Sequence, residues 1–337
     1  MCGAAKFFVS IIILPAFLTP CFAQQAPNSP ASTGSVVVNV LDAHGNAVRD
    51  LTKENFRFRL NGKPVTVLDA RYSLAPRRIV VLLDVSGSMT GETGSGKWQI
   101  VREAVEDLLT QTPSDVSIAM LTFAGGVRDV FDFLDGKKAI TKWLSEGPSQ
   151  RPDLRYPATR TALFDAILEG LKLFGPIQTG DALYAITDGG EDASQATQVQ
   201  TKSALLHSGV RLFAFLFDKP LPVPDEPFLT VTQEQEARES FRKMVDDSGG
   251  FVFSVAGFEI RHLASWNVDY IYDNDNREKV KLYTKELNIQ VSGFWTLENA
   301  VPASNEESRM NVEIVGHEGR IRKDVRVTYS RMLSAAK

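Results

Sequence analysis

The sequence predicts an α/β protein with a Rossmann-like, doubly wound and mostly parallel sheet, flanked by β-rich segments at both ends. In the middle of the 337-residue chain, uninterrupted apolar runs alternate with amphipathic helical stretches. This alternation is typical of parallel strands that helices cover on both faces. Residues 35–76 and 280–330 instead contain short runs of alternating polarity, as in half-buried antiparallel strands. The length suits about two domains.

The composition describes an ordinary, slightly acidic globular protein. Hydrophobic residues make up 43% of the chain and charged residues 23%, which excludes a disordered or low-complexity protein. The formal net charge of −4 argues against a partner held through its phosphates, so no nucleic acid is expected. Only four histidines are present, which argues against a metal site built on imidazole.

Residues 1–23 have the three parts of a signal peptide. Lys6 precedes an apolar run over residues 7–18, and a small-x-small ending follows at residues 21–23. The run is shorter than the ~20 residues of a spanning helix, so we expect no transmembrane span after cleavage. A membrane anchor, or a lipid tether at Cys21, is the alternative. The signal peptide predicts export to the periplasm, the cell envelope or the extracellular space. Both cysteines lie in this segment, so the mature protein would contain no disulfide.

A linker and a β segment precede the middle of the chain. Residues 24–34 are rich in Pro, Ser, Ala and Gln, which predicts a flexible linker. The β segment at residues 35–76 contains the turn sequence Asn61-Gly62 between two alternating runs. Strands are expected at residues 36–41, 56–60 and 65–67.

Residues 77–257 are predicted to form the α/β domain. Within residues 97–111, apolar side chains recur at i, i+3, i+4, i+7 and i+8, which indicates an amphipathic helix. A second helix is expected over residues 161–173, and residues 127–133 are a candidate for an added edge strand. Buried strands are expected at residues 78–84, 116–123, 182–187, 210–217 and 251–255.

The chain then continues with a predicted helical connection at residues 258–279, its helix at about 258–271, and a C-terminal β segment at 280–330. Three strands alone cannot enclose a core. We therefore expect the two β-rich flanks to pair into one sandwich, into which the α/β domain is inserted. C-terminal strands are expected at residues 285–291, 309–315 and 323–329.

Five oxygen-bearing side chains are predicted to meet at one edge of the central sheet. Each comes from a strand end or the start of a helix, and in an open α/β sheet these loops project beyond the carboxyl ends of the strands, where ligands bind. Such donors, without His or Cys, suit Mg²⁺, Ca²⁺ or Mn²⁺ better than zinc or copper. The residues are Asp84, Ser86, Ser88, Thr161 and Asp188.

This pattern, Asp-x-Ser-x-Ser followed by the distant Thr161 and by Asp188 in Ile-Thr-Asp-Gly, resembles the metal-ion-dependent adhesion site of von Willebrand factor type A domains. The exported chain also resembles bacterial secreted proteins of that superfamily. The resemblance implies that Ser86, Ser88 and Thr161 coordinate the cation while Asp84 and Asp188 hold ordered waters. It further implies that an Asp or Glu carboxylate of a partner protein completes the coordination. Thr159 is an alternative to Thr161.

Two charged segments lie beside the predicted site. The loop that contains Arg151 and Arg155 could pair with a partner's carboxylate, or could simply be solvated. Glu191 and Asp192 follow Asp188 closely and are interpreted as a charged loop.

Two enzymatic interpretations are disfavoured. Residues 91–97 fit the phosphate-loop pattern G-x-x-x-x-G-K, but Trp98 stands where a Mg²⁺-binding hydroxyl should follow, so no nucleotide is expected. Neither Ser86 nor Ser88 lies in a G-x-S-x-G motif. The sequence therefore predicts an exported, non-enzymatic protein for adhesion or protein–protein interaction. A cell-envelope protein with a purely structural metal site is the alternative, followed by a metal-dependent hydrolase.

Overall fold

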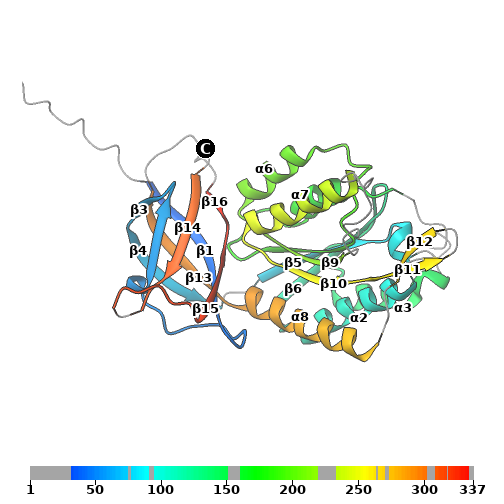
Figure 1. Ribbon diagram of the computed structural model, residues 1–337, viewed down its shortest axis with the longest axis horizontal. Helices are drawn as coiled ribbons and strands as arrows, with labels where there is room; N and C mark the ends of the chain where they lie inside the picture. The colour runs from blue at the N-terminus through cyan, green and yellow to red at the C-terminus, as the bar shows by residue number, and fades with distance from the viewer. Residues whose placement is uncertain are drawn as a thin grey trace, which may run out of the picture.

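The computed structural model describes residues 32–74, 77–90, 95–150, 160–218, 233–262, 265–269, 273–301, 308–316 and 318–333. These residues form a β-sandwich and an α/β domain that lie side by side (Figure 1). The predicted signal peptide, residues 24–31 of the predicted linker, and the loop that contains Arg151, Arg155 and Thr159 lie outside the described residues. Among the helices described, none combines the length and apolar character needed to cross a bilayer.

The α/β domain is built on a six-stranded sheet with the order β10-β9-β8-β5-β6-β7. Neighbouring strands are parallel except for β7, which runs antiparallel to β6 at the sheet edge, where an added strand was expected. The predicted α/β class is thereby confirmed. The strands are β5 (Arg77–Asp84), β6 (Val116–Phe123), β7 (Val127–Phe131), β8 (Ala182–Thr187), β9 (Arg211–Asp218) and β10 (Val252–Ala256).

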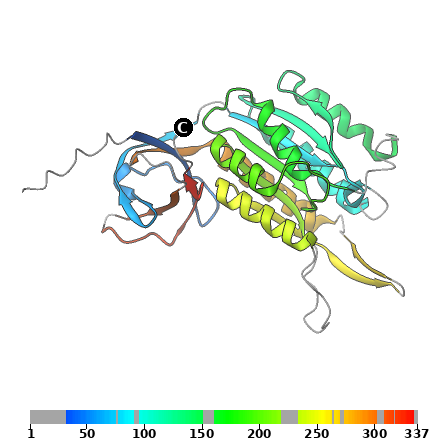
Figure 2. The same ribbon diagram turned by 90° about the horizontal axis from the view of Figure 1, so that it is seen from above.

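Helices cover both faces of this sheet, as Figures 1 and 2 show. Strand β5 explains why: Val81 and Leu83 pack into one apolar core, whereas Val80 and Leu82 pack into the other. The first core is completed by α2 (Ser95–Gln111), α3 (Gly136–Gln150) and α8 (Asn274–Ser292), and the second by α5 (Leu163–Leu173), α6 (Gln198–Ser208) and α7 (Gln233–Ser248).

The sandwich combines strands from both ends of the chain, which confirms the predicted pairing of the β-rich flanks. One sheet has the order β15-β1-β13-β4 and the other β16-β14-β2-β3, and they enclose a shared apolar core. The first contains β1 (Ser32–Asp42), β4 (Val67–Ser73), β13 (Phe294–Val301) and β15 (Val325–Tyr329). The second contains β2 (Phe56–Leu60), β3 (Lys63–Val65), β14 (Ser308–Ile314) and β16 (Met332–Leu333), and the short 3₁₀ helix η1 (Lys53–Asn55) precedes it.

The chain leaves and re-enters the sandwich at adjacent positions. Ser73, at the end of β4, pairs with Phe294, at the start of β13. The whole α/β domain is inserted between these two residues, and α8 leads directly into β13.

Two elements predicted between residues 258 and 291 were wrong. The expected helix at 258–271 is replaced by the antiparallel strands β11 (Phe258–His262) and β12 (Ser265–Asp269), which Figure 2 shows extending away from the domain. The expected strand at 285–291 belongs to α8, and β13 was not predicted. Local alternation misled the interpretation here. Over a longer window, the side chains that α8 buries include Val280, Thr284, Leu287 and Val291, which recur with helical spacing.

Candidate metal centre

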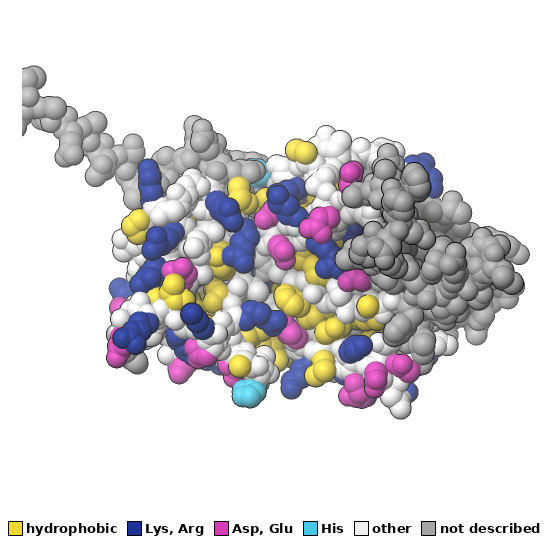
Figure 3. All heavy atoms as spheres, in the orientation of Figure 1, with side chains coloured by type: hydrophobic (Ala, Val, Ile, Leu, Met, Phe, Trp, Pro, Cys, Tyr) yellow, Lys and Arg dark blue, Asp and Glu magenta, His cyan; other side chains and the backbone are white. Residues whose placement is uncertain are grey.

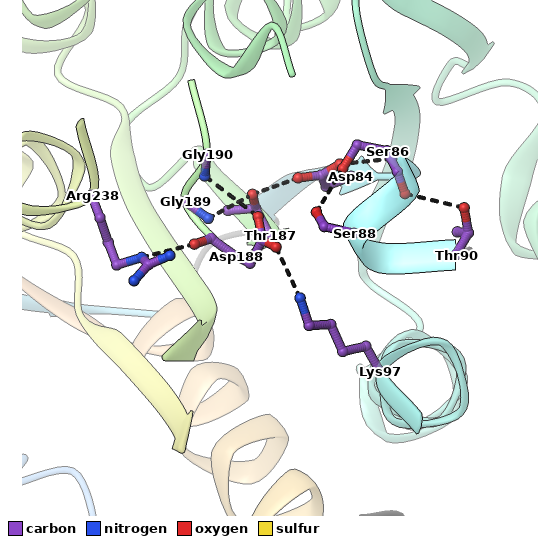
Figure 4. A network of polar contacts seen from close by, with 10 residues as sticks. All are labelled: Asp84, Ser86, Ser88, Thr90, Lys97, Thr187, Asp188, Gly189, Gly190 and Arg238. Carbon is purple, nitrogen blue, oxygen red and sulfur yellow. Dashed lines mark hydrogen bonds and ion pairs between the residues drawn. The ribbon is translucent and has the colours of Figure 1, made fainter. Parts of the chain in front are cut away.

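The end of β5 supplies the first three predicted site residues. Asp84 is the last residue of the strand and is fully buried. Its Oδ1 accepts a hydrogen bond from the Ser86 N–H at 2.9 Å, which fixes the turn that leads into the short helix α1 (Gly87–Thr90). The hydroxyls of Ser86 and Ser88 lie 3.3 Å apart (Figure 4). One carboxylate and two hydroxyls therefore converge at this strand end.

The end of the neighbouring strand β8 supplies Asp188, which is 2% exposed. The preceding residue, Thr187, donates its hydroxyl to Asp84 Oδ2 at 2.7 Å and so joins the two strand ends. Its oxygen also accepts the Gly189 N–H at 3.0 Å. Gly189 has a φ of +76°, a backbone conformation that residues with a side chain rarely adopt. Thr187 was not predicted as part of the site.

Thr161 lies just before α5, which begins at Leu163 rather than at Thr161 itself. Its N–H donates to Asp192 Oδ1 at 2.7 Å, and its carbonyl accepts the Asp192 N–H at 3.0 Å. A Cβ added at Gly190 would lie 3.6 Å from Thr161 Oγ1 and 3.5 Å from Asp188 Oδ1. The hydroxyl and the carboxylate therefore border the same small space, which a glycine leaves open.

The predicted residues thus gather at the carboxyl edge of the sheet, and two of them carry negative charge. Burial, together with the nearby charge of Asp188, raises the pKa of Asp84 to about 7, although hydrogen bonds from Thr187 and Ser86 oppose the shift. Two buried carboxylates in this position repel each other and attract a cation.

A positively charged side chain of the protein, Lys97, already contacts the Asp188 carboxylate. Lys97 Nζ donates to Asp188 Oδ2 at 2.9 Å, and the Lys97 side chain is only 5% exposed (Figure 4). The sequence interpretation treated Lys97 as part of a misleading phosphate-loop pattern. A signal was nevertheless present, because Lys97 falls on the apolar face of its helix, four residues before Val101.

The charged residues after Asp188 also have defined partners. Glu191 Oε2 accepts the Phe164 N–H at 2.9 Å and so satisfies the beginning of α5. Asp192 holds the Thr161 backbone, as described above. Both residues lie in a charged loop, as expected, and the loop also holds the backbone of Thr161 and the start of α5. A further basic residue, Arg238 of α7, donates from Nε to the Asp188 carbonyl at 2.9 Å.

Comparison with known families agrees with this geometry. Residues 79–191, which contain all five candidate residues, match the family model of the von Willebrand factor type A domain. Residues 79–191 thus belong to a von Willebrand factor type A domain. Domains of this family are generally non-enzymatic interaction modules.

Solved structures similar to this chain include two from Bacteroides. An aerotolerance-related membrane protein from Bacteroides fragilis is 18% identical, covers 64% of this chain and 98% of its own, and has a TM-score of 0.42. BatB from Bacteroides thetaiotaomicron is 17% identical, covers 63% and 98%, and has a TM-score of 0.41. A von Willebrand factor type A protein from Catenulispora acidiphila is 11% identical, covers 93% and 76%, and has a TM-score of 0.43. No curated protein matches the chain.

The donor set of the type A domain fits a hard divalent cation. It offers two carboxylates and three hydroxyls, all of them oxygen ligands. Among the described residues, no group of three or more His, Cys, Asp or Glu side chains is placed to hold a metal, so a zinc-type cluster is absent from this part of the chain.

Proposed function

We propose that the type A domain holds a divalent cation at its sheet edge and binds, through that ion, an aspartate or glutamate side chain of a partner protein. Mg²⁺ is expected, and Ca²⁺ or Mn²⁺ would suit the same oxygens. The observation that carries the proposal is that oxygen-bearing side chains from three separate loops meet around two buried carboxylates. The ligand set is Asp84, Ser86, Ser88, Thr161 and Asp188.

Each part of this set has a separate task. Asp84 and Asp188 supply the negative charge that keeps a cation in a buried place. Ser86, Ser88 and Thr161 offer neutral oxygens, so the ion's charge is not overcompensated. When bound, an ion of this class offers an electrophilic position to one further oxygen anion.

The exposed side of the site indicates where a partner would approach. Asp84, Thr161 and Asp188 are buried, whereas Ser88 and Gly190 are partly exposed. A partner carboxylate would therefore come in along Ser88 and Gly190. On the face drawn in Figure 3, the described Lys and Arg side chains are interspersed with Asp and Glu, so this face as a whole carries mixed charge.

The cellular setting is part of the proposal. We propose that residues 1–23 direct export and that the protein works in the periplasm, the cell envelope or outside the cell. A non-enzymatic role in adhesion or protein–protein interaction agrees with the generally non-enzymatic character of type A domains.

A second candidate is a purely structural ion. The burial of Asp84, Thr161 and Asp188 favours it, since a cation among them would cross-link three loops without any partner. The protein would then be a structural component of the cell envelope.

The metal assignment is tested by titrating the chelator-treated protein with Mn²⁺ and following free Mn²⁺ by electron paramagnetic resonance. Ser86→Ala and Asp188→Ala should abolish binding while keeping the circular dichroism spectrum of a folded protein, although Asp188→Ala should unfold at a lower temperature because it removes a carboxylate that pairs with buried Lys97. Ser145→Ala, at an exposed position in α3, is the matched control and should bind as the unaltered protein does. Equal affinity in all four proteins would overturn the assignment.

The partner assignment is tested by immobilising the protein and passing an extract of the native cells over it in Mg²⁺. A specific partner should elute with EDTA and should fail to bind an Asp188→Ala column. Changing the partner's surface Asp and Glu residues one at a time to their amides should then locate the bridging carboxylate. A partner that stays bound in EDTA would favour the structural ion instead.

A further inference from the structure

The contact between Lys97 and Asp188 crosses from one element to another. Lys97 lies in the first turn of α2, and Asp188 follows β8, yet Nζ and Oδ2 are 2.9 Å apart. Both side chains are at most 5% exposed. The ammonium also lies 5.8 Å from the centre of the Phe217 ring, on the adjoining strand β9.

This is a costly place for a positive charge. Burial removes the hydration of the ammonium, and the beginning of a helix carries a partial positive charge that repels it. The nearby carboxylates offset both costs. The position of Lys97 therefore depends on the same negative charge that the proposed metal ion needs.

The two carboxylate oxygens of Asp188 face different groups. Oδ1 borders the space beside Gly190 and Thr161 Oγ1, whereas Oδ2 accepts from Lys97. A divalent ion bound among the hydroxyls would thus contact one oxygen of the Asp188 carboxylate, and the Lys97 ammonium would contact the other.

We propose that Lys97 is a built-in counter-cation that stabilises the carboxylate pair when no metal is bound and opposes the binding of the metal. This inference rests on the proposed metal site. When both carboxylates are ionised, as in the metal-bound state, Asp84, Asp188 and Lys97 sum to one negative charge, so a divalent ion gives this group one surplus positive charge. Without Lys97 the two carboxylates and the ion would sum to zero, and Arg238, which donates to the Asp188 carbonyl, contributes the same positive charge in both cases. Lys97 therefore weakens the hold on the ion and strengthens the attraction of the loaded site for an anionic group.

Lys97→Met tests this idea, because methionine keeps an unbranched apolar stem next to Phe217 and removes only the charge. Mn²⁺ affinity should rise by about tenfold or more when the opposing charge is lost. In EDTA the melting temperature of the variant should fall, and Mg²⁺ should restore it.

Two further variants separate the charge at this position from charge in general. Arg102→Met removes one positive charge from the same helix, but Arg102 is 47% exposed and lies about 140° around the helix from Lys97. Its Mn²⁺ affinity should stay within about twofold of the unaltered protein, because solvent and salt screen this position. Lys97→Arg keeps the charge and should keep the lower affinity.

The outcomes are distinct. If Lys97→Met binds Mn²⁺ with equal or lower affinity while the unaltered protein binds it, the counter-cation proposal is overturned and the metal site stands. If neither protein binds Mn²⁺, the metal site itself fails, and Lys97 is a permanent ion-pair partner. A Lys97→Met protein that stays unfolded even in Mg²⁺ also overturns the proposal, because the metal then cannot replace the ammonium.

Discussion

Each end of the parallel sheet buries a pair of like charges, two carboxylates at the carboxyl end and two guanidinium groups at the amino end. At the carboxyl end lie Asp84 and Asp188, with Lys97 beside them. At the amino end lie Arg77, the first residue of β5, and Arg211, the first residue of β9, each 3% exposed. The carboxyl end is the candidate metal site, and the amino end faces the sandwich (Figure 1).

The amino end neutralises its charge with fixed dipoles. Arg211 Nη1 donates to Asn39 Oδ1 at 2.5 Å and to the Gln290 carbonyl at 3.0 Å. Asn39, from sandwich strand β1, donates in turn to the carbonyls of Gln290 and Gly293 at 2.9 Å each. These carbonyls belong to the end of α8, where the helix dipole is negative. Burial and the charge of Arg77 nevertheless lower the pKa of Arg211 to about 9.

The comparison shows two ways to tolerate a buried charge. The dipoles at the amino end are part of the covalent chain, so they are present whenever the protein is folded. The proposed ion at the carboxyl end exchanges with solvent, so that end responds to solution conditions. The amino end should therefore behave as a permanent joint between the two domains, and the carboxyl end as a responsive site.

The largest effect is expected at the amino end, from Asn39→Ala. This change leaves Arg211 and two buried carbonyls without their amide partner and should lower the free energy of unfolding by about 3 kcal/mol. Urea unfolding should show the same loss in Mg²⁺ and in EDTA. If the free energy of unfolding falls only in EDTA, the amino end also depends on the metal, and the proposed difference between the two ends is wrong.

A smaller effect is expected at the carboxyl end, from pH. Because the folded pKa of Asp84 is about 7 and its ordinary value is 3.8, the folded state binds more protons than the unfolded state between these values. The metal-free protein should therefore lose stability as pH rises, by about 2 kcal/mol from pH 5 to pH 7. Unfolding in EDTA at both pH values measures this loss.

Two controls sharpen that measurement. Asp84→Asn should remove most of the pH dependence, and Mg²⁺ should reduce it in the unaltered protein by holding the carboxylate ionised. Stability that instead rises from pH 5 to pH 7 in EDTA would contradict the raised pKa.

Glu191→Gln should have a more modest effect, again at the carboxyl end. The Glu191 carboxylate accepts the Phe164 N–H at the start of α5, and a neutral amide interacts less well with a helix N-terminus. Thermal unfolding should show that the free energy of unfolding falls by about 1 kcal/mol. Mn²⁺ binding should also weaken, because the same loop positions Thr161. Unchanged Mn²⁺ affinity would show that Thr161 is positioned independently.

The smallest effect is expected far from both ends. Arg71 lies on the sandwich with its side chain 72% exposed and pairs with Asp69 at 2.5 Å. Arg71→Ala should change the free energy of unfolding by less than about 0.5 kcal/mol, because solvent screens the pair. If urea unfolding shows a larger fall in the free energy of unfolding, an exposed ion pair stabilises this protein as well, and burial is then not what distinguishes the charges at the two ends of the sheet.

The sequence predicted the sheet, the pairing of the flanks and the strand ends at which Asp84 and Asp188 lie, because strand polarity and strand ends are encoded locally. It did not predict Lys97 or Thr187 as neighbours of the carboxylates, since those contacts arise only when α2 and β8 are brought beside β5. It also missed the buried arginine at position 211, whose partners lie in β1 and α8. The helix–strand error in α8 has a related cause: a short alternating window agreed with a strand, while the longer helical period decided the structure.

The pairing of Ser73 with Phe294 has a mechanical consequence. Because the type A domain enters and leaves the sandwich at facing residues, tension applied to the two chain ends would run through the sandwich strands and bypass the inserted domain. A protein stretched between two attachment points could thus keep its ion-binding loops undistorted until the sandwich itself ruptured.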